Sequence, residues 1–105
     1  MEYEILTYLR QNHTGKSRAI QSSELEVRFH IQGAKLRVMV NTLRSDGHPI
    51  CSDESGYFYA ATRAEVRYTI RQLRSRISKI VGAMIGLVHS LERLPDDSGQ
   101  ISLLM

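Results

Sequence analysis

The sequence predicts a mainly α-helical protein that contains one small β-hairpin and continues into a long C-terminal helix. Three patterns support this fold class: two short segments within residues 22–45 have apolar residues at helical spacing, residues 49–60 read as two strands about a polar turn, and residues 63–93 carry a heptad repeat. With 105 residues and a 42% hydrophobic composition, the chain can build one core. We divide it into a folded domain (residues 1–61), a long helix (62–94) and an acidic linker with an apolar tail (95–105).

The N-terminal segment predicts a first helix from Glu2 to about Asn12, because Ile5, Leu6 and Leu9 fall on one side of it. Residues 13–18 are polar and contain a glycine, which is typical of a loop. Residues 19–21 are long enough for only one short strand.

Residues 22–45 predict two amphipathic helices joined by a tight turn. Ser22 or Ser23 is expected to cap a helix that buries Leu25 and Phe29 and ends near His30. Residues 31–33 form the turn, and Gly47 ends the second helix. The buried stripe of that second helix consists of Leu36, Met39, Val40 and Leu43.

The opposite side of the second helix is cationic and rich in hydrogen-bonding groups. Its residues are Ala34, Arg37, Val38, Asn41 and Ser45, with Lys35, Thr42 and Arg44 on the flanks. The whole chain has a formal charge of +3, and residues 1–94, with 14 basic and 9 acidic residues, have +5. This balance suits an anionic partner.

The hairpin is predicted from strands at residues 49–52 and 57–60 and a turn at 53–56. Cys51, the single cysteine, is expected to be a small buried hydrophobe, and it excludes an internal disulfide. The aromatic run 57–59 favours core and cross-strand packing over base stacking. Because Asp53 and Glu54 would be repelled by phosphate, we assign the hairpin a structural role.

Residues 20–59 resemble a winged helix-turn-helix DNA-binding domain, and the segment LRSDGHPICSDESGYFY in particular is similar to the end of the recognition helix and the wing of small prophage proteins from low-GC Gram-positive bacteria. The resemblance implies that the second helix is a recognition helix and that residues 19–21 add an edge to the wing. Three positions depart from the family pattern: Glu26 replaces a small residue, His30 a glycine, and Gln32 a capping serine.

The C-terminal helix is predicted to begin at about Arg63, after a capping box formed by Thr62 and Glu65, and to end at about Arg93. Its apolar residues, which we call the seam, are spaced alternately by four and three: Val66, Ile70, Leu73, Ile77, Ile80, Met84, Leu87 and Leu91. A small domain cannot cover so long a seam, so we predict a homodimer or higher oligomer. The alternative is a helix that folds back over its own domain, which would bury at most its N-terminal half.

Beside the seam, Arg63, Arg67, Arg71 and Arg74 share one side of the helix, and only Glu65 opposes them. Such a row can contact phosphates without sequence specificity or dock on an acidic protein, or it can be a solvated surface. Lys16 and Arg18 lead into a helix start where phosphates commonly bind, although a solvated loop would have the same composition.

No pattern indicates catalysis, a metal site or a cofactor. The four histidines are scattered and lack neighbouring ligands at metal spacing, and no phosphate-binding loop, nucleophile motif or carboxylate pair is present. The acidic start of the chain argues against a signal peptide, and the longest apolar run is far too short to span a bilayer. We therefore expect a cytoplasmic protein that is not an enzyme.

Two functions compete on this evidence. In the first, the protein is a phage-derived, dimeric regulatory or replication-associated protein that binds double-stranded DNA. Its base contacts would be Arg37 and Asn41, its phosphate contacts Lys35, Arg44, Lys16 and Arg18, and its non-specific contacts Arg67, Arg71 and Arg74. In the second, the same scaffold is a protein-binding module that occupies a host protein.

The last residues suggest a further partner. Gln100, Ser102, Leu103 and Leu104 resemble the short motif by which bacterial replication and repair proteins bind the sliding clamp. The tail departs from that motif at Ile101, where leucine is common, and at Leu104, where phenylalanine is common. The alternative is a tail that packs on its own dimer or stays disordered.

Overall fold

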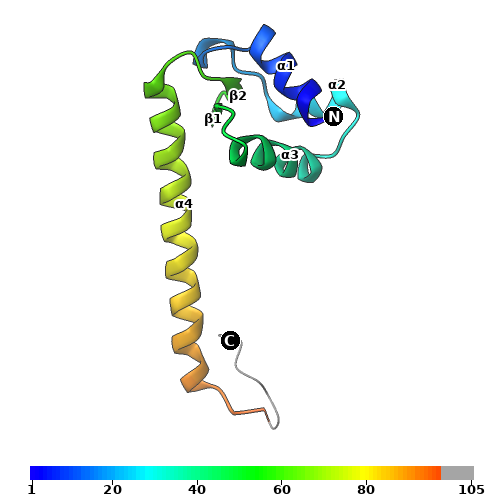
Figure 1. The fold of residues 1–105 in the computed structure, drawn as a ribbon. Helices are drawn as coiled ribbons and strands as arrows, with labels where there is room; N and C mark the ends of the chain where they lie inside the picture. The colour runs from blue at the N-terminus through cyan, green and yellow to red at the C-terminus, as the bar shows by residue number, and fades with distance from the viewer. Residues whose placement is uncertain (98–105) are drawn as a thin grey trace. The chain divides into compact units, whose positions relative to one another are not determined.

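The computed structural model describes residues 1–97, and it confirms a mainly helical chain with a small antiparallel hairpin and a long C-terminal helix (Figure 1). The elements are α1 (Glu2–Asn12), η1 (Lys16–Arg18), α2 (Ser22–Phe29), α3 (Gly33–Ser45), β1 (Ile50–Asp53), β2 (Gly56–Tyr59), α4 (Arg63–Ser90) and η2 (Leu91–Arg93). Within the described residues these elements form two compact units, the first from Met1 to Gln72 and the second beginning at Leu73.

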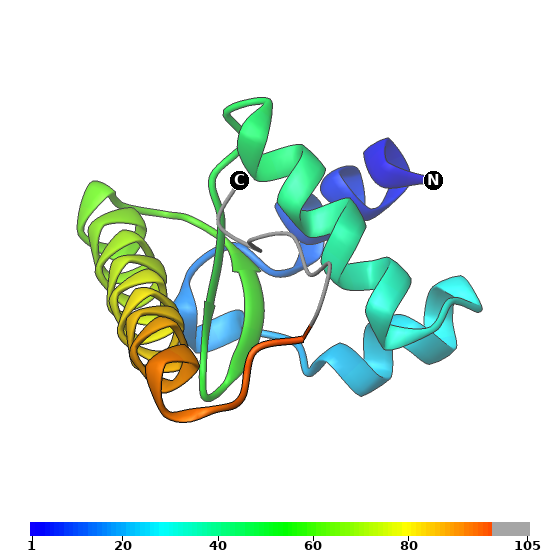
Figure 2. The ribbon, with the colours of Figure 1, turned by 90° about the horizontal axis from the view of Figure 1, so that it is seen from below.

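The core of the first unit lies between the three short helices and the hairpin. Figure 2 shows α1, α2 and α3 gathered beside the hairpin; α1 contacts β2 and α3, and α3 contacts α2 and β1. The predicted inward residues of α1 and α3 are all buried, as are Leu25, Ile50, Cys51 and Phe58. Phe29, Tyr57 and Tyr59 are partly buried against the same core.

The start of α2 corrects the predicted cap. Gln21, not Ser22 or Ser23, occupies the N-cap position with an extended backbone, and no side chain caps the helix. The side-chain amide of Gln21 instead donates a hydrogen bond of 3.0 Å to the carbonyl of Ser55 in the hairpin turn. This contact joins the residue before α2 to the hairpin turn.

The turn between α2 and α3 involves His30 and Glu26, two of the three residues that depart from the winged helix-turn-helix pattern. His30 ends α2 in the left-handed conformation, with φ of 55°. Gly33, predicted in the turn, is the first residue of α3, and a Cβ atom there would lie 3.3 Å from the Glu26 carboxylate. That carboxylate lies beside an uncapped helix N-terminus, where a negative charge is stabilising. Gln32 provides no side-chain cap to α3.

The hairpin pairs Cys51 with Phe58 and closes through a turn at Glu54 and Ser55. Gly56 begins β2 with φ of 122°, and a Cβ atom there would lie 2.1 Å from the Ile20 carbonyl oxygen. Only glycine fits this position, because both the backbone conformation and the close approach exclude a side chain.

Residues 13–21 differ from the predicted loop and strand. Residues 16–18 form a short 3-10 helix, and residues 19–21 supply only an isolated bridge between Ile20 and Tyr57. A second bridge, between Thr14 and Tyr59, was not predicted. The 3-10 turn separates the two bridges, so the segment touches both ends of β2 without forming a continuous strand.

The long helix begins at the predicted residue. The capping box is confirmed, since the Glu65 amide donates to Thr62 Oγ1 and the Thr62 amide to Glu65 Oε1, both at 3.3 Å. The α-helix ends at Ser90, whose hydroxyl donates to the Leu87 carbonyl, and Leu91 lies in the following 3-10 turn rather than in the predicted helix. Within residues 1–97, no helix combines the length and the apolar composition that crossing a membrane requires.

Replacing His30 with glycine should stabilise the first unit. The left-handed conformation costs a residue with a Cβ about 1 to 2 kcal/mol, whereas the extra entropy loss of glycine is roughly 0.5 to 1 kcal/mol. We therefore expect His30→Gly to raise the free energy of unfolding by about 0.5 to 1 kcal/mol, measured by urea denaturation. His30→Ala, which keeps the Cβ, is the control and should give no gain; an equal effect of both substitutions would show that the imbalance is not conformational.

Candidate nucleic-acid interface

The exposed face of α3 is available for binding. Ala34, Lys35, Arg37, Val38, Asn41 and Ser45 are exposed, whereas the stripe on the other side of the helix is at most 5% exposed. In the described part of the chain, the side chains of Lys35, Arg37 and Asn41 make no hydrogen bond or ion pair. No acidic residue occurs within α3. The buried side of α3 is packed in the core, and its exposed side presents hydrogen-bond donors that have no partner within residues 1–97.

Unlike the other predicted DNA-binding residues of α3, Arg44 directs its side chain toward the hairpin. Its guanidinium donates a hydrogen bond of 2.7 Å from Nε to the Ile50 carbonyl and one of 3.1 Å to the Ser52 hydroxyl. These bonds tie the end of α3 to β1. The side chain predicted to hold a phosphate is thus engaged in connecting the helix to the hairpin.

Lys16 is also partly committed. Its Nζ atom lies 3.7 Å from Asp53 Oδ2, and the Asp53 side chain is only 1% exposed. The other oxygen of Asp53 accepts a hydrogen bond of 2.7 Å from the Ser55 amide and so braces the turn. This corrects the prediction of an acidic tip, because Asp53 is turned inward at the end of β1 and Glu54 alone is exposed there.

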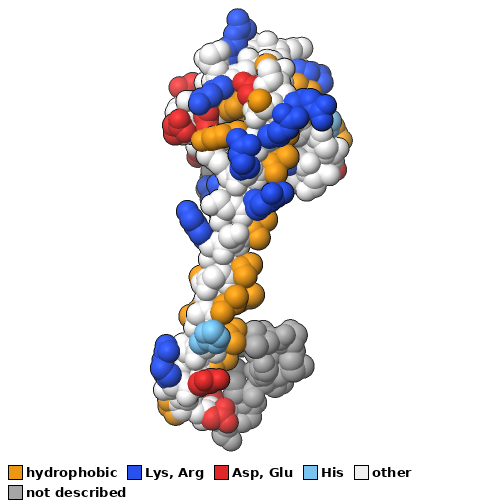
Figure 3. Space-filling model, turned by 90° about the vertical axis from the view of Figure 1, so that its left-hand side faces the viewer, with side chains coloured by type: hydrophobic (Ala, Val, Ile, Leu, Met, Phe, Trp, Pro, Cys, Tyr) orange, Lys and Arg blue, Asp and Glu red, His pale blue; other side chains and the backbone are white. Residues whose placement is uncertain are grey.

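The predicted cations outside α3 lie at three places. Arg18 is exposed at the end of η1, and its side chain has no polar partner within residues 1–97. Arg63, Arg67 and Arg71 are exposed on the first turns of α4, and Arg71 lies 5.9 Å from the centre of the Tyr68 ring. Arg74 is exposed in the second unit. None of these five arginines forms a salt bridge in the part of the chain that is described. Figure 3 shows several basic side chains on the visible face of the first unit.

A single carboxylate organises the loop that carries Lys16 and Arg18. Glu65 accepts hydrogen bonds from the backbone amides of Lys16, at 2.9 Å, Ala61, at 2.7 Å, and Thr62, at 3.3 Å. The bond from Lys16, followed by that from Ala61, lowers the pKa of Glu65 below its ordinary value of 4.5. The first turn of α4 thereby holds the chain segment that follows α1.

The seam is largely uncovered. In the first unit, α4 is anchored by Thr69, which is 5% exposed and whose hydroxyl accepts a 3.4 Å hydrogen bond from the Ser52 amide. Val66 is partly buried, but Ile70 is 47% exposed. In the second unit, Ile77, Ile80, Met84, Leu87 and Leu91 are between 52% and 70% exposed, and Leu73 is half-buried.

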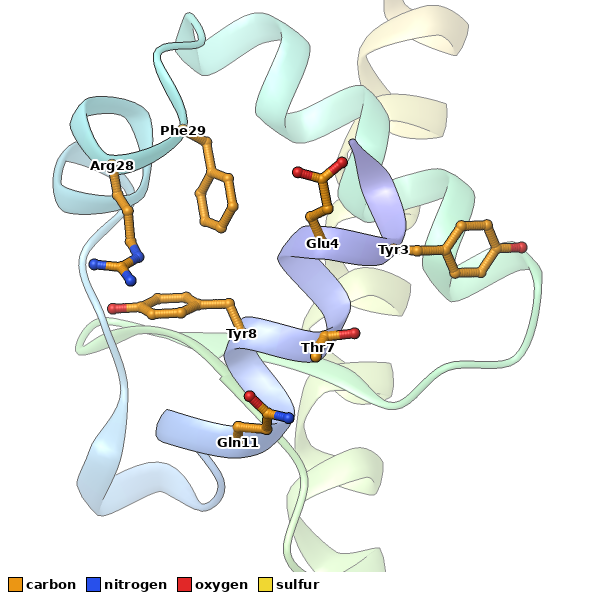
Figure 4. A pocket seen from close by; sticks show the side chains of 7 residues that line it. All are labelled: Tyr3, Glu4, Thr7, Tyr8, Gln11, Arg28 and Phe29. Atoms are coloured by element: carbon orange, nitrogen blue, oxygen red, sulfur yellow. The ribbon is translucent and has the colours of Figure 1, made fainter.

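An open groove of about 480 Å³ between α1 and α2 was not predicted from the sequence (Figure 4). The Arg28 guanidinium lies 4.1 Å from the centre of the Tyr8 ring, and the Phe29 ring meets that ring edge-on at 5.6 Å. Because Arg28 already covers one side of the Tyr8 ring, that side of the ring is not open to a ligand. The pairing of Tyr8 with Arg28 joins two separate helices, so no local pattern in the sequence indicates it.

Cys51 has the surroundings of a structural residue. It is 1% exposed, and burial raises the pKa of its thiol above 9.0, despite an opposing hydrogen bond with Thr69. Among residues 1–97, no three histidine, cysteine, aspartate or glutamate side chains come together in a way that could hold a metal ion.

The predicted DNA contacts in α3 and at Lys16 divide into two groups. Arg37, Asn41 and Lys35 lie together on one helix face, whereas Lys16 and Arg44 have partners within the fold. The clamp-like residues Gln100, Ser102, Leu103 and Leu104 lie outside the described residues. No protein-family model, curated protein or solved structure matches this chain.

Replacing Glu65 with glutamine tests its role in ordering the basic loop. Glu65→Gln should lower the free energy of unfolding at pH 7 by about 1 kcal/mol, below the usual range for hydrogen bonds to a charged group because solvent screens this carboxylate. The pKa of Glu65 is depressed in the folded state, so its contribution is present above the unfolded pKa and is lost as the pH falls through the folded value. Urea denaturation at pH 7 and below pH 4 measures both effects.

The matched control is Glu54→Gln, since Glu54 is an exposed carboxylate without a hydrogen-bond partner in the described chain. Its effect should stay within a few tenths of a kcal/mol at both pH values. A Glu65→Gln penalty that is independent of pH would contradict a role for the ionised carboxylate.

Proposed function

We propose that the first unit is a winged helix-turn-helix domain that binds double-stranded DNA through the exposed face of α3. The observation that carries the proposal is the set of uncommitted donors on that face, Lys35, Arg37 and Asn41, on a helix free of acidic residues. The order of α2, a short turn, α3 and an antiparallel hairpin supports the same reading. Its resemblance to small prophage proteins extends the proposal to a phage-derived regulatory or replication-associated role.

The side chains of α3 match the chemistry of base edges in the major groove. Arg37 and Asn41 are one helical turn apart, and their side chains can pair with guanine and adenine respectively. Val38, between them and 63% exposed, offers an apolar surface. The corresponding apolar group in the major groove is the methyl group of thymine, so a mixed target site is favoured over a purely G·C one.

Phosphate contacts are assigned to the cations whose side chains make no hydrogen bond or ion pair within residues 1–97. Lys35 flanks the base-reading residues, and Arg18 lies in the loop fixed by Glu65. Arg67, Arg71 and Arg74 add sequence-independent attraction, which should fall steeply with salt. Arg44 is not assigned to phosphate, because its guanidinium bonds to β1. Lys16 is expected to contribute less to phosphate binding than Lys35, because its ammonium group lies beside the Asp53 carboxylate.

We further propose that the protein acts as a homodimer through the seam of α4. The seam contains five large apolar side chains that are at least half exposed, and no charged residue lies between them on that side of the helix. An exposed apolar surface of this kind is typical of a helix–helix interface. Two-fold symmetric DNA-binding proteins commonly read paired half-sites, so a dimer also suits the proposed function.

Arg37→Ala should cost about 1 to 3 kcal/mol of specific DNA binding and relax the sequence preference, because it removes a paired hydrogen bond to a base. Arg10→Ala is the matched control: it removes the same charge from an exposed position on α1. Binding to a selected duplex and to an unrelated duplex, measured over a range of salt concentrations, separates the two effects. If the wild type binds no duplex even at low salt, the DNA proposal is abandoned in favour of a protein-binding role.

Substituting Ile77→Asp together with Met84→Asp should convert the dimer into a monomer whose first unit stays folded, because two buried, unpaired charges cost several kcal/mol at an interface. Sedimentation at micromolar concentration measures the change. Ser75→Asp with His89→Asp adds the same charges on the opposite side of α4, where both residues are exposed, and should leave the dimer intact. A monomeric wild type would contradict the proposed self-association.

A further inference from the structure

The charges of the second unit are distributed unequally along it. Arg74, Arg76 and Lys79 lie near its start and give +3, and no charged residue occurs from Ile80 to Leu91. Residues 92–97 then contain Glu92, Arg93, Asp96 and Asp97, a net charge of −2. In Figure 3, apolar side chains follow one side of α4 between the basic side chains near the start of this unit and the acidic side chains that come after the helix. The two ends therefore differ in sign, and the apolar middle does not distinguish them.

We propose that this seam pairs with the same seam of a second copy in antiparallel orientation. The inference rests on the self-association proposed above and adds its direction. The exposed seam is then covered by the same helix of a second copy. Because that helix runs in the opposite direction, its acidic end lies beside the basic end of the first.

The apolar residues accommodate this arrangement without a change of register. In heptad terms, Leu73, Ile80 and Leu87 occupy one core position, and Ile77, Met84 and Leu91 occupy the other. Reversing one helix about residue 82 pairs Leu73 with Leu91, Ile77 with Leu87 and Ile80 with Met84 of the second copy. Every exposed seam residue of the second unit thus meets an apolar residue.

The flanking charges decide between the two directions. Arg74 and Arg76 occupy the positions immediately on either side of the core in this heptad assignment. A parallel pair would bring both arginines of each copy to the same level, and Lys79 just beyond them, so like charges would gather at one end. An antiparallel pair separates the two basic ends and brings each toward Glu92, Asp96 and Asp97 of the second copy.

Disulfide cross-linking of the full chain tests the direction. In a Cys51→Ala background, one tagged chain carries Leu73→Cys and one untagged chain carries Leu91→Cys. In the antiparallel pair, two copies of the same introduced cysteine are 18 residues apart along the helix, or about 27 Å, far beyond the limit of about 7 Å between Cα atoms for a disulfide. The mixture should therefore form the mixed disulfide, and each chain alone should not, as seen on non-reducing gels.

A second pair, Ile77→Cys with Leu87→Cys, repeats the test nearer the centre of the seam and keeps it decisive if the outer positions fray. Circular dichroism and sedimentation of each variant report folding and dimerisation separately. Disulfides formed by each chain alone would establish a parallel pair and overturn this inference, while leaving the dimer and DNA binding untouched. A dimer that forms no disulfide in either mixture would overturn it as well, and a monomer would overturn both the direction and the self-association.

Discussion

The loop of the first unit that carries Lys16 and Arg18 depends for its position on the carboxylate of Glu65. One side chain near the start of α4 accepts hydrogen bonds from backbone amides on both sides of the hairpin, those of Lys16, Ala61 and Thr62. It thereby joins the segment after α1 to the segment after β2, and its bond to Lys16 spans 49 residues of the sequence. Because ionised acceptors form stronger hydrogen bonds than neutral ones, a single residue can order a loop that has little apolar surface of its own.

The relation between α3 and its surroundings explains how a helix without a capping side chain can still be a firm platform. Its N-terminus faces the Glu26 carboxylate, its inner stripe is almost fully buried, and the Arg44 guanidinium fixes its C-terminal end to β1. Each device acts on a different part of the helix. Together they leave the outer face rigid and chemically uncommitted, which is the combination that precise recognition of another molecule requires.

Local patterns in the sequence were sufficient for the helices, the hairpin and the capping box of Thr62 and Glu65, because periodicity and capping involve residues within one or two turns of each other. They failed where distant segments decide the outcome. The N-cap position of α2 is Gln21, whose side chain bonds to Ser55 instead of capping the helix, and the Asp53 side chain is turned inward beside Lys16. Likewise, the predicted phosphate contact Arg44 could not be distinguished from Arg37 by composition, since only the fold brings Ile50 to one of them.

Thr69 marks a boundary in how the chain is supported, because no side chain after it is buried within residues 1–97. The first unit has a core whose integrity does not depend on how much protein is present. The following turns of α4 lack such support, and isolated helices of this length are marginal in water. With self-association as proposed, the helicity of that segment is coupled to assembly. Dilution would then unwind one half of α4 while the other half stayed folded. The helical content of the protein would therefore depend on its concentration.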